Sequence, residues 1–317
     1  MESSLFDMLK EGKKVGAFGS MNADYSFSLP AFPQPGSTVK AFAMNVRPGG
    51  KSSNQAVQAA LLGMESEMFG QVGEDPRGEW LIKKLAEAGV ETQKIIRKGP
   101  ESGSAFIMVD PRGENEIVVN PGANGSLGEG YLEEVKADLS SLDALGFCLE
   151  VPVETVEKAL REVEGPIKVL NVSPMPPSPS LDMARGADVV IVNEEEAKDV
   201  MGNKPLPSSP DSFLWGTAAK MLKKRGLPAV VITLGSKGSV ALEEGKAYPI
   251  PSKRVSPKDT TGCGDSFAGS LLAGLASGMA LADAARLASF ASAFSALGEG
   301  AQSSYGTKEE IKKFAEE

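Results

Sequence analysis

The clearest chemical feature of the sequence is the segment DTTGCGDSFAGSLLAGL at positions 259–275. Gly262, Cys263 and Gly264 stand just before an apolar helix that we expect to begin near Asp265. Backbone N–H groups in such a turn can converge with the helix dipole on an anion, and glycine permits the close approach. Asp265, at the mouth of this turn, can accept a proton from a hydroxyl group that attacks a bound phosphate. The alternative is a plain helix cap, since Asp is a favoured N-cap residue.

Two further segments suit a phosphate site, and each also has a simpler structural explanation. The apolar run 229–234 ends in the loop Gly-Ser-Lys-Gly at 235–238, which can form a second wall of a nucleotide site or an ordinary β-turn. Asn193 is followed three residues later by Glu196, which is the spacing of a capping box. Glu196 can also help to hold hydrated Mg²⁺, a hard cation that prefers oxygen ligands and keeps its waters. The two roles of Glu196 are compatible.

A third group of polar residues is suited to binding hydroxyl groups. Asn22 and Asp24 follow the first predicted strand, and Asn54 opens a predicted helix behind the glycine pair 49–50. Amide and carboxylate groups suit bidentate contacts with vicinal hydroxyls, and glycines let a small ligand approach the backbone. Glu150 ends another predicted strand and would face the same crevice. The same residues can instead be parts of turns and helix caps, and Glu150 a solvated strand end, none of which needs a ligand. The sequence leaves both the binding role and the structural role open.

The composition excludes several classes of chemistry. The 317 residues include no histidine, which excludes a Ser–His or Cys–His pair and leaves proton transfer to Asp, Glu, Lys, Tyr or Cys. Two cysteines, Cys148 and Cys263, cannot build a disulfide framework, which fits a reducing cytoplasm. The net charge of −9 argues against nucleic-acid or anionic-membrane partners, because both need a basic surface. With neither a signal peptide nor a membrane span expected, we predict a soluble cytoplasmic protein.

The elements that must position these residues alternate along the chain. Short runs rich in β-branched or aromatic residues predict strands at 15–19, 66–70, 145–149, 169–172, 189–192 and 229–234. Amphipathic stretches between them predict helices at 54–62, 79–88, 153–164, 213–225 and 281–297. Such alternation indicates βαβ units, and therefore a mostly parallel sheet with helices on both faces. A ligand should then lie at the carboxyl ends of the strands.

Two stretches interrupt this alternation. Segments of about 22–46 and 103–120 have strand-like patterns around turn signals, with no helix between them. The second indicates a hairpin that turns at 111–115. We interpret both as a small antiparallel lid inserted in one α/β domain that spans residues 1–317. The alternative is that both are surface loops.

Nine segments in this order resemble the PfkB carbohydrate kinase family, and within it the ribokinases. The likeness runs from about Val15 to Phe314. It rests on NAD, FPQPGSTV, GGKSSNQA, NPGAN, LE, NEEEA, ITLGSKG, DTTGCGD and GAQSS. The resemblance implies a ribokinase-like three-layer α/β sandwich with a mostly parallel central sheet and a small antiparallel β lid. It also implies dimerisation through that lid.

The resemblance assigns roles to individual residues. Asp265 would be the catalytic base, and the amides of Gly262, Cys263 and Gly264 would form an anion hole for the γ-phosphoryl group of ATP. The sugar would contact Asn22, Asp24, Gly50, Lys51, Asn54, Glu150 and Asp265. ATP would be bound by Asn193, Thr233, Gly235, Ser236, Gly238, Gly264 and Ser289, with Glu196 near Mg²⁺. A monovalent cation, usually K⁺, would be held by Asp259, Thr261, Ser295, Gly298, Gly300 and Ser304, several of them through backbone carbonyls.

The expected activity is therefore the ATP-dependent phosphorylation of a small sugar, with D-ribose and its 5-hydroxyl as the favoured acceptor. Two alternatives stay open. Another PfkB-family kinase, acting on fructose, 2-keto-3-deoxygluconate or a nucleoside, would use the same Asp265 chemistry. A non-catalytic sugar-binding protein would bind ribose without forming ADP.

Overall fold

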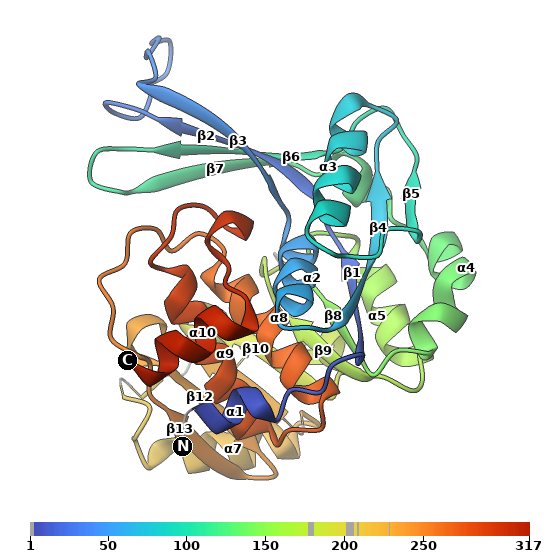
Figure 1. Ribbon diagram of the computed structural model, residues 1–317, viewed down its shortest axis with the longest axis vertical. Coiled ribbons are helices and arrows are strands. Elements are labelled where there is room, and N and C mark those ends of the chain that lie inside the picture. The colour runs from blue at the N-terminus through green and yellow to red at the C-terminus, as the bar shows by residue number, and fades with distance from the viewer. Residues whose placement is uncertain (1–2, 177–180, 201–205, 208, 228) are drawn as a thin grey trace.

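A nine-stranded sheet lies at the centre of the computed structural model, which describes residues 3–176, 181–200, 206–207, 209–227 and 229–317. Its strand order is β13-β12-β11-β10-β9-β8-β1-β4-β5 (Figure 1). Neighbouring strands from β11 to β5 run parallel, and only β12 and β13, at one edge, pair antiparallel. The strands are β1 (Lys14–Gly19), β4 (Glu65–Val72), β5 (Ile95–Arg97), β8 (Ala144–Phe147), β9 (Ile167–Asn171), β10 (Val189–Asn193), β11 (Ala229–Thr233), β12 (Ser239–Glu243) and β13 (Lys246–Ile250).

Helices cover both faces of this sheet. The helices are α1 (Ser3–Asp7), α2 (Lys51–Leu61), α3 (Pro76–Glu87), α4 (Glu129–Ser140), α5 (Val153–Glu162), α6 (Glu194–Val200), α7 (Leu214–Lys224), α8 (Cys263–Ala276), α9 (Leu281–Ser295) and α10 (Lys308–Glu316). Helices α4, α5, α6 and α7 pack on one face, and α1, α2, α3, α8, α9 and α10 pack on the other. The expected three-layer α/β sandwich is confirmed.

The strands show why the sheet is buried on both sides. Successive side chains of a strand point to opposite faces, so strands covered on both faces are largely apolar along their length. In β10, Val190 and Val192 join the hydrophobic core under α5 and α7, whereas Val189 and Ile191 join the core under α8 and α9. The continuous apolar runs in the sequence are therefore explained by two separate cores.

All six predicted strands of the sheet are present, with ends close to the predicted positions. Helices α2 and α3 begin earlier than predicted, at Lys51 and Pro76, because their polar first turns carry no apolar periodicity. The edge hairpin of β12 and β13 was not predicted, although Glu244 and Gly245 form its turn with φ values of 49° and 80°. A Glu-Gly pair between short alternating segments is a weak hairpin signal.

A second, smaller sheet projects from the carboxyl-terminal edge of the large one. It contains β2 (Asn22–Ser28), β3 (Ala43–Gly49), β6 (Gly103–Val109) and β7 (Asn115–Asn120), in the order β3-β2-β6-β7. The pairs β2–β3 and β6–β7 are antiparallel, as expected, whereas β2 and β6 pair in parallel. The central pair is parallel because both strands leave the domain at the same point, with Asn22 opposite Gly103. We call this sheet the lid sheet.

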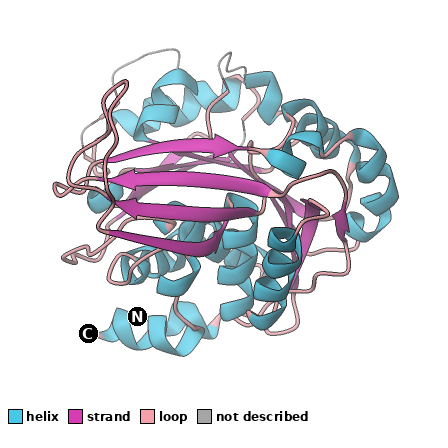
Figure 2. Ribbon diagram, turned by 90° about the horizontal axis from the view of Figure 1, so that it is seen from above, coloured by secondary structure: helices cyan, strands magenta, loops and turns pink. Residues whose placement is uncertain are grey.

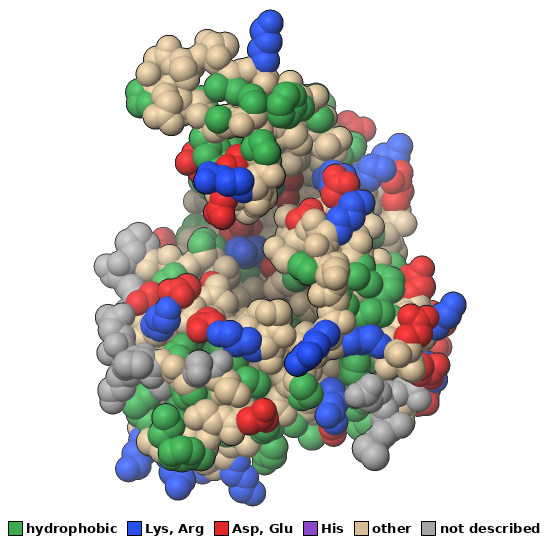
Figure 3. All heavy atoms as spheres, turned by 90° about the vertical axis from the view of Figure 1, so that its left-hand side faces the viewer, with side chains coloured by type: hydrophobic (Ala, Val, Ile, Leu, Met, Phe, Trp, Pro, Cys, Tyr) green, Lys and Arg blue, Asp and Glu red, His purple; other side chains and the backbone are tan. Residues whose placement is uncertain are grey.

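The lid sheet extends over one side of the α/β layers. Viewed from above, its four strands lie side by side across the domain (Figure 2). A space-filling view shows the lid sheet projecting above a hollowed face of the molecule (Figure 3). Within the described part of the chain, no helix is both long and apolar enough to cross a membrane.

Candidate active site

The glycine turn before α8 has an open front. Gly262 is the N-cap of α8, with φ 76° and ψ 0°, a left-handed conformation that favours glycine. A methyl group added at Gly264 would meet no atom within 4 Å, so the backbone there is accessible to a ligand. The amide of Cys263 donates to the carbonyl oxygen of Thr260 at 3.2 Å. An anion at this turn can therefore use the helix N-terminus directly, and would compete with Thr260 for the Cys263 amide.

Asp265 is not the cap of α8. It lies in the first turn of the helix, and its carboxylate accepts a hydrogen bond from Nδ2 of Asn54 at 2.8 Å. The plain N-cap interpretation of Asp265 is therefore wrong. Burial raises the pKa of Asp265, while the nearby Lys51 ammonium and the Asn54 amide act in the opposite direction. The result is a buried carboxylate whose proton affinity is increased, as a general base requires.

Close packing of two helices brings these residues together. A methyl group added at Gly269 of α8 would lie 2.4 Å from the carbonyl oxygen of Gln55 in α2. The missing side chain lets the two backbones approach, so Asn54 of α2 reaches Asp265 of α8, and the charge of Lys51 acts on the same carboxylate. Burial disfavours the charged form of Lys51, but Asp265 and Glu150 more than compensate, and its pKa is raised.

The residues expected to bind hydroxyl groups gather beside Asp265. Asp24 lies against the backbone of Gly49, where an added methyl group would be 1.9 Å from Oδ2 of Asp24. Burial, together with the negative charges of Glu150 and Asp265, raises the pKa of Asp24 to about 7. An Oε2 atom of Glu150 accepts hydrogen bonds from the Ser20 hydroxyl at 2.5 Å and from the Lys51 amide at 3.1 Å. Three carboxylates and one ammonium group therefore share this cleft.

Three residues that the sequence analysis missed hold this cluster in place. Nδ2 of Asn124 donates to Oδ1 of Asn22 at 2.8 Å, and the Asn124 side chain also bonds both backbone groups of Met21. Ser20 orients Glu150, and Nε2 of Gln302 donates to Oδ1 of Asn54 at 3.0 Å. Asn124 and Gln302 lie in the NPGAN and GAQ segments, which could have drawn attention to them.

A small cavity lies against Gly264. Its volume is about 130 Å³, smaller than a nucleoside triphosphate, so a nucleotide would also extend over the surrounding surface. It is lined by Thr233, Gly235, Gly238, Ser252, Cys263, Gly264, Phe267, Ser289 and Ser292. Five of the residues expected to bind ATP are thus brought together. The other two, Asn193 and Ser236, do not line this cavity.

Asn193 and Glu196 form a reciprocal cap at the start of α6. The Glu196 amide donates to Oδ1 of Asn193 at 2.8 Å, and the Asn193 amide donates to Oε2 of Glu196 at 2.7 Å. The capping box is therefore confirmed. Burial raises the pKa of Glu196, which is 8% exposed. Among the described residues, no three His, Cys, Asp or Glu side chains form a metal-binding group, so Mg²⁺ here would depend on phosphate and water oxygens.

The loop expected to hold a monovalent cation is organised around Asp259. Its two carboxylate oxygens accept hydrogen bonds from the amides of Thr261 at 2.9 Å and Gly300 at 2.8 Å. These amides hold the pKa of Asp259 below its usual value, although burial acts to raise it. Gly298 packs on Ser304, since a methyl group added at Gly298 would be 2.5 Å from Cβ of Ser304. Oxygen-rich loops of this kind suit a hard cation.

The sixth residue of that set, Ser295, is already bonded within the protein. Its hydroxyl lies 3.3 Å from the Cys263 sulfur and 2.9 Å from the carbonyl oxygen of Ser292. The Ser304 hydroxyl likewise donates to the carbonyl oxygen of Ala301 at 2.8 Å. A cation at this loop would therefore be held mainly by carbonyl oxygens rather than by the two hydroxyls.

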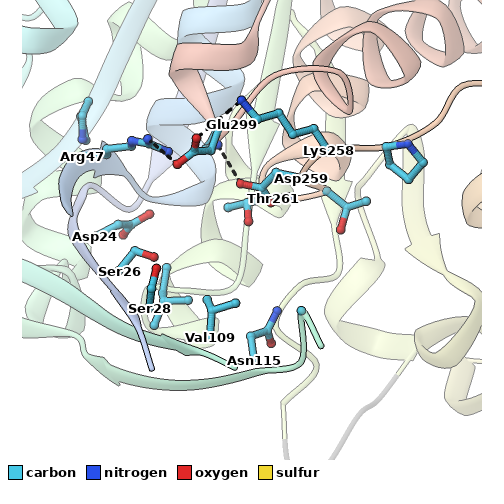
Figure 4. A pocket seen from close by; sticks show the side chains of 17 residues that line it. Asp24, Ser26, Ser28, Arg47, Val109, Asn115, Lys258, Asp259, Thr261 and Glu299 are labelled. Atoms are coloured by element: carbon cyan, nitrogen blue, oxygen red, sulfur yellow. Dashed lines mark hydrogen bonds and ion pairs between the residues drawn. The ribbon is translucent and has the colours of Figure 1, made fainter. Parts of the chain in front are cut away.

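A cavity of about 410 Å³ separates the lid sheet from the domain below it (Figure 4). Asp24, Ser26 and Ser28 line it from β2, and Asp259 and Thr261 face them from the loop before α8. An ion pair crosses the opening, from Nη2 of Arg47 in β3 to Oε1 of Glu299 at 2.9 Å. The cavity is thus lined by residues from both the lid sheet and the domain below it.

The α/β sheet, the glycine turn with its buried carboxylate and the lid together define a kinase that phosphorylates a small polar molecule. The model of the pfkB family carbohydrate kinases matches residues 13–308. The chain belongs to this family and is an ATP-dependent carbohydrate kinase.

Individual relatives agree with this assignment. A ribokinase from Haemophilus influenzae is 34% identical over 96% of this chain and 99% of its own length. A deoxyribokinase from Salmonella typhi is 31% identical over 95% of this chain and 98% of its own length. Among solved structures, a ribokinase from Thermotoga maritima has a TM-score of 0.86 at 30% identity and covers 96% of this chain and 100% of its own. A ribokinase from Cryptococcus neoformans in complex with ADP has a TM-score of 0.78 at 30% identity, with the same coverage of 96% and 100%.

Proposed function

We propose that the protein transfers the γ-phosphoryl group of ATP to the 5-hydroxyl of D-ribose, with Asp265 as general base. The observation that carries this proposal is the position of Asp265. Its carboxylate lies at the junction of the hydroxyl-binding cluster around Asp24 and the open turn at Gly264. A sugar hydroxyl in the first region and a phosphate at the second would meet at this carboxylate.

Each part of the cleft has a defined task in this reaction. Asp265 accepts the proton of the sugar hydroxyl as the hydroxyl oxygen attacks the γ-phosphorus of ATP, and the bond from that phosphorus to the β,γ-bridging oxygen breaks to release ADP. The amides of Gly262, Cys263 and Gly264, with the positive end of the α8 dipole, stabilise charge on the transferred group. Phosphoryl transfer depends mainly on such positioning and charge stabilisation. The lid sheet excludes water, which would otherwise compete as acceptor.

The sugar is held by Asn22, Asp24, Gly50, Lys51, Asn54 and Glu150, and the nucleotide by Asn193, Thr233, Gly235, Ser236, Gly238, Gly264 and Ser289. Support comes from the 410 Å³ cavity, which Asp24 lines, and from the 130 Å³ cavity, which Gly264 lines. Glu196 would help to hold hydrated Mg²⁺, which would supply charge neutralisation on the phosphates. The contact with Asn193 leaves Glu196 fixed for that role.

A monovalent cation such as K⁺ belongs to the proposal as an activator bound at Asp259, Thr261, Ser295, Gly298, Gly300 and Ser304. The donor set fits, because Asp259 fixes the Gly300 segment through its amide. The test is activity in K⁺ against tetramethylammonium at equal ionic strength. Activity that is independent of K⁺ would leave the loop a purely structural feature.

We also propose a homodimer formed through the outer face of the lid sheet. The strand register places Val46, Tyr25, Phe106 and Val118 in one row across that face. Val118 is 57% exposed, and the rings of Tyr25 and Phe106 stack with centroids 5.2 Å apart. An exposed apolar row favours a protein partner. Val118→Lys should shift the protein from dimer to monomer in sedimentation, and a wild-type monomer would contradict the proposal.

The two free thiols support a cytoplasmic location.

A substrate panel tests the central proposal. ADP release is measured with D-ribose, 2-deoxy-D-ribose, fructose, 2-keto-3-deoxygluconate and adenosine, and phosphorus NMR locates the product phosphate. We expect the highest kcat/KM with D-ribose and phosphate on O5. A higher value with 2-deoxy-D-ribose would assign the activity of the Salmonella typhi relative instead. Ribose binding without ADP release would indicate a non-catalytic sugar-binding protein.

A further inference from the structure

Tyr305 contacts the glycine turn from behind and has no role in the reaction as described so far. Its side chain is buried, with 8% exposed, and its hydroxyl donates to the carbonyl oxygen of Gly262 at 2.9 Å. The same oxygen accepts the amide of Ser266 at 2.8 Å, the first regular bond of α8. Tyr305 therefore adds a second donor to a carbonyl that the helix already uses.

This bond helps to fix the peptide unit that carries the Cys263 N–H, which in this structure donates to the carbonyl oxygen of Thr260 at 3.2 Å. The carbonyl of Gly262 and the N–H of Cys263 belong to one planar trans peptide unit, so they point in opposite directions. A donor that fixes the Gly262 oxygen therefore also fixes the direction of the Cys263 N–H, which an anion bound at the turn would take over from the carbonyl oxygen of Thr260. Gly262 needs such a restraint, because glycine in the left-handed region can rotate easily.

The packing around Gly262 supports this interpretation. A methyl group added at Gly262 would lie 2.5 Å from Cβ of Ala301 and 2.7 Å from the Tyr305 hydroxyl. Both residues come from the segment around the 3₁₀ turn η4 (Gln302–Ser304). The turn before α8 thus rests directly on this segment, which leaves little room for the peptide to rotate.

The same segment also reaches the proposed base. Gln302 donates to Oδ1 of Asn54, which leaves Nδ2 of Asn54 directed at Asp265, where it donates at 2.8 Å. The segment around η4 therefore contacts both parts of the proposed catalytic site. It reaches the Asp265 carboxylate through Gln302 and Asn54, and it reaches the glycine turn through Tyr305. This inference rests on the proposed roles of Asp265 and the glycine turn.

We propose that Tyr305 is a positioning residue for phosphoryl transfer, acting through the Gly262 carbonyl on the amides that receive the γ-phosphoryl group. Its effect is expected in the transition state, where charge on the transferred group is met by those amides. The hydroxyl lies behind the turn and touches neither sugar nor nucleotide in this arrangement. Its loss should therefore lower kcat and leave the KM of the sugar nearly unchanged.

Tyr305→Phe removes only the hydroxyl, and Tyr131→Phe is its matched control. Tyr131 is 6% exposed, and its hydroxyl donates to a backbone carbonyl, that of Lys94, at 2.6 Å. Both variants lose one buried hydrogen bond, so similar decreases in Tm are expected. We expect Tyr305→Phe to lower kcat about tenfold, with sugar KM within about twofold of wild type. Tyr131→Phe should keep kcat within about twofold.

The inference is overturned if Tyr305→Phe keeps wild-type kcat, or if Tyr131→Phe loses as much activity. A rise in sugar KM without loss of kcat would also overturn it. Tyr305→Met, which is apolar and without a hydroxyl, replaces Tyr305→Phe if the latter does not fold. The test uses whichever sugar the panel selects, so failure of ribose as substrate does not affect it. Failure of Asp265 as base would appear separately, as activity retained by Asp265→Asn.

Discussion

Two groups of carboxylates in this molecule respond to the fold in opposite ways. Asp75 caps α3 and accepts hydrogen bonds from the Gly78 amide at 2.9 Å, the Ser102 hydroxyl at 2.6 Å and Nε of Arg77 at 2.8 Å. Burial acts to raise its pKa, but these donors lower it to about 2. In the cleft, burial and like charges raise the pKa of Asp24 to about 7. The pKa values differ because hydrogen-bond donors surround Asp75, whereas burial and the charges of Glu150 and Asp265 dominate around Asp24.

The opposite pKa shifts distinguish carboxylates that stabilise the fold from carboxylates that are placed to bind a ligand. A carboxylate with a lowered pKa stabilises the folded state above its unfolded pKa of about 4 and loses this contribution as the pH falls toward 2. A carboxylate with a raised pKa contributes stability below about 4, and loses it as the pH rises through about 7. At neutral pH the raised pKa of Asp24 therefore lowers the stability of the folded state. This is consistent with a group whose role is to bind a sugar.

The largest effect is expected from Asp265→Asn. The side chain keeps its shape and its contact with Asn54, but it cannot accept a proton, so kcat should fall by about 10³-fold or more. Because the buried charge is removed, Tm should stay the same or rise. Coupled kinase assays and thermal unfolding measure both.

Asp143→Asn is the control from the other group. Asp143 binds Nζ of Lys13 at 2.7 Å and the Lys14 amide at 2.9 Å, and these donors hold its pKa below the usual value against the effect of burial. The Asp143→Asn variant should be less stable than wild type and have the wild-type kcat. If Asp265→Asn instead unfolds the protein while Asp143→Asn does not, the division between the two groups is wrong.

The sequence allowed much of the large sheet to be predicted, because its strands are continuous apolar runs. The core positions in β10 show this clearly, since both faces of the strand are buried. The lid sheet was harder, because the parallel pairing of β2 and β6 joins segments that are far apart in the chain. Nothing within either segment specifies this pairing.

For the site, residue types suggested the chemistry, but contacts between helices decided it. The sequence is compatible with Asp265 as either a general base or a helix cap. In the structure its carboxylate accepts a hydrogen bond from Asn54 of α2 instead of capping α8. That contact depends on Gly269, which has no distinguishing pattern in an apolar helix. Tyr305 gave no signal at all, because a buried tyrosine is compatible with an ordinary core position.

Asp24→Asn should have the next largest effect, on sugar binding rather than on the chemical step. The amide fits the space beside Gly49 but loses a charged acceptor, so sugar KM should rise about 10- to 100-fold. In wild type, kcat/KM should rise with pH through about 7 as Asp24 ionises. The part of that pH dependence due to Asp24 should disappear in the variant. A variant with the wild-type pH profile would show that Asp24 does not titrate in this range.

In contrast to Asp24→Asn, Asp75→Ala should lower the stability of the protein and have little effect on kcat. The free energy of unfolding at pH 7 should fall by about 2 kcal/mol, since a cap and several charged hydrogen bonds are removed. The difference between wild type and variant should shrink as the pH falls from about 4 toward 2. Asp75→Asn keeps an acceptor for the Gly78 amide and should lose less. Urea unfolding at several pH values measures this.

The smallest effect is expected at Glu299, a carboxylate that belongs to neither group. Its ion pair with Arg47 joins the lid sheet to the domain, but the two side chains are 52% and 34% exposed. Solvent screens such a pair, so Glu299→Gln should change the free energy of unfolding by less than about 0.5 kcal/mol, and by nothing measurable in 1 M salt. If Glu299→Gln destabilised the protein as much as Asp75→Ala, donor number and burial would not be what distinguishes stabilising carboxylates here, and the comparison would fail.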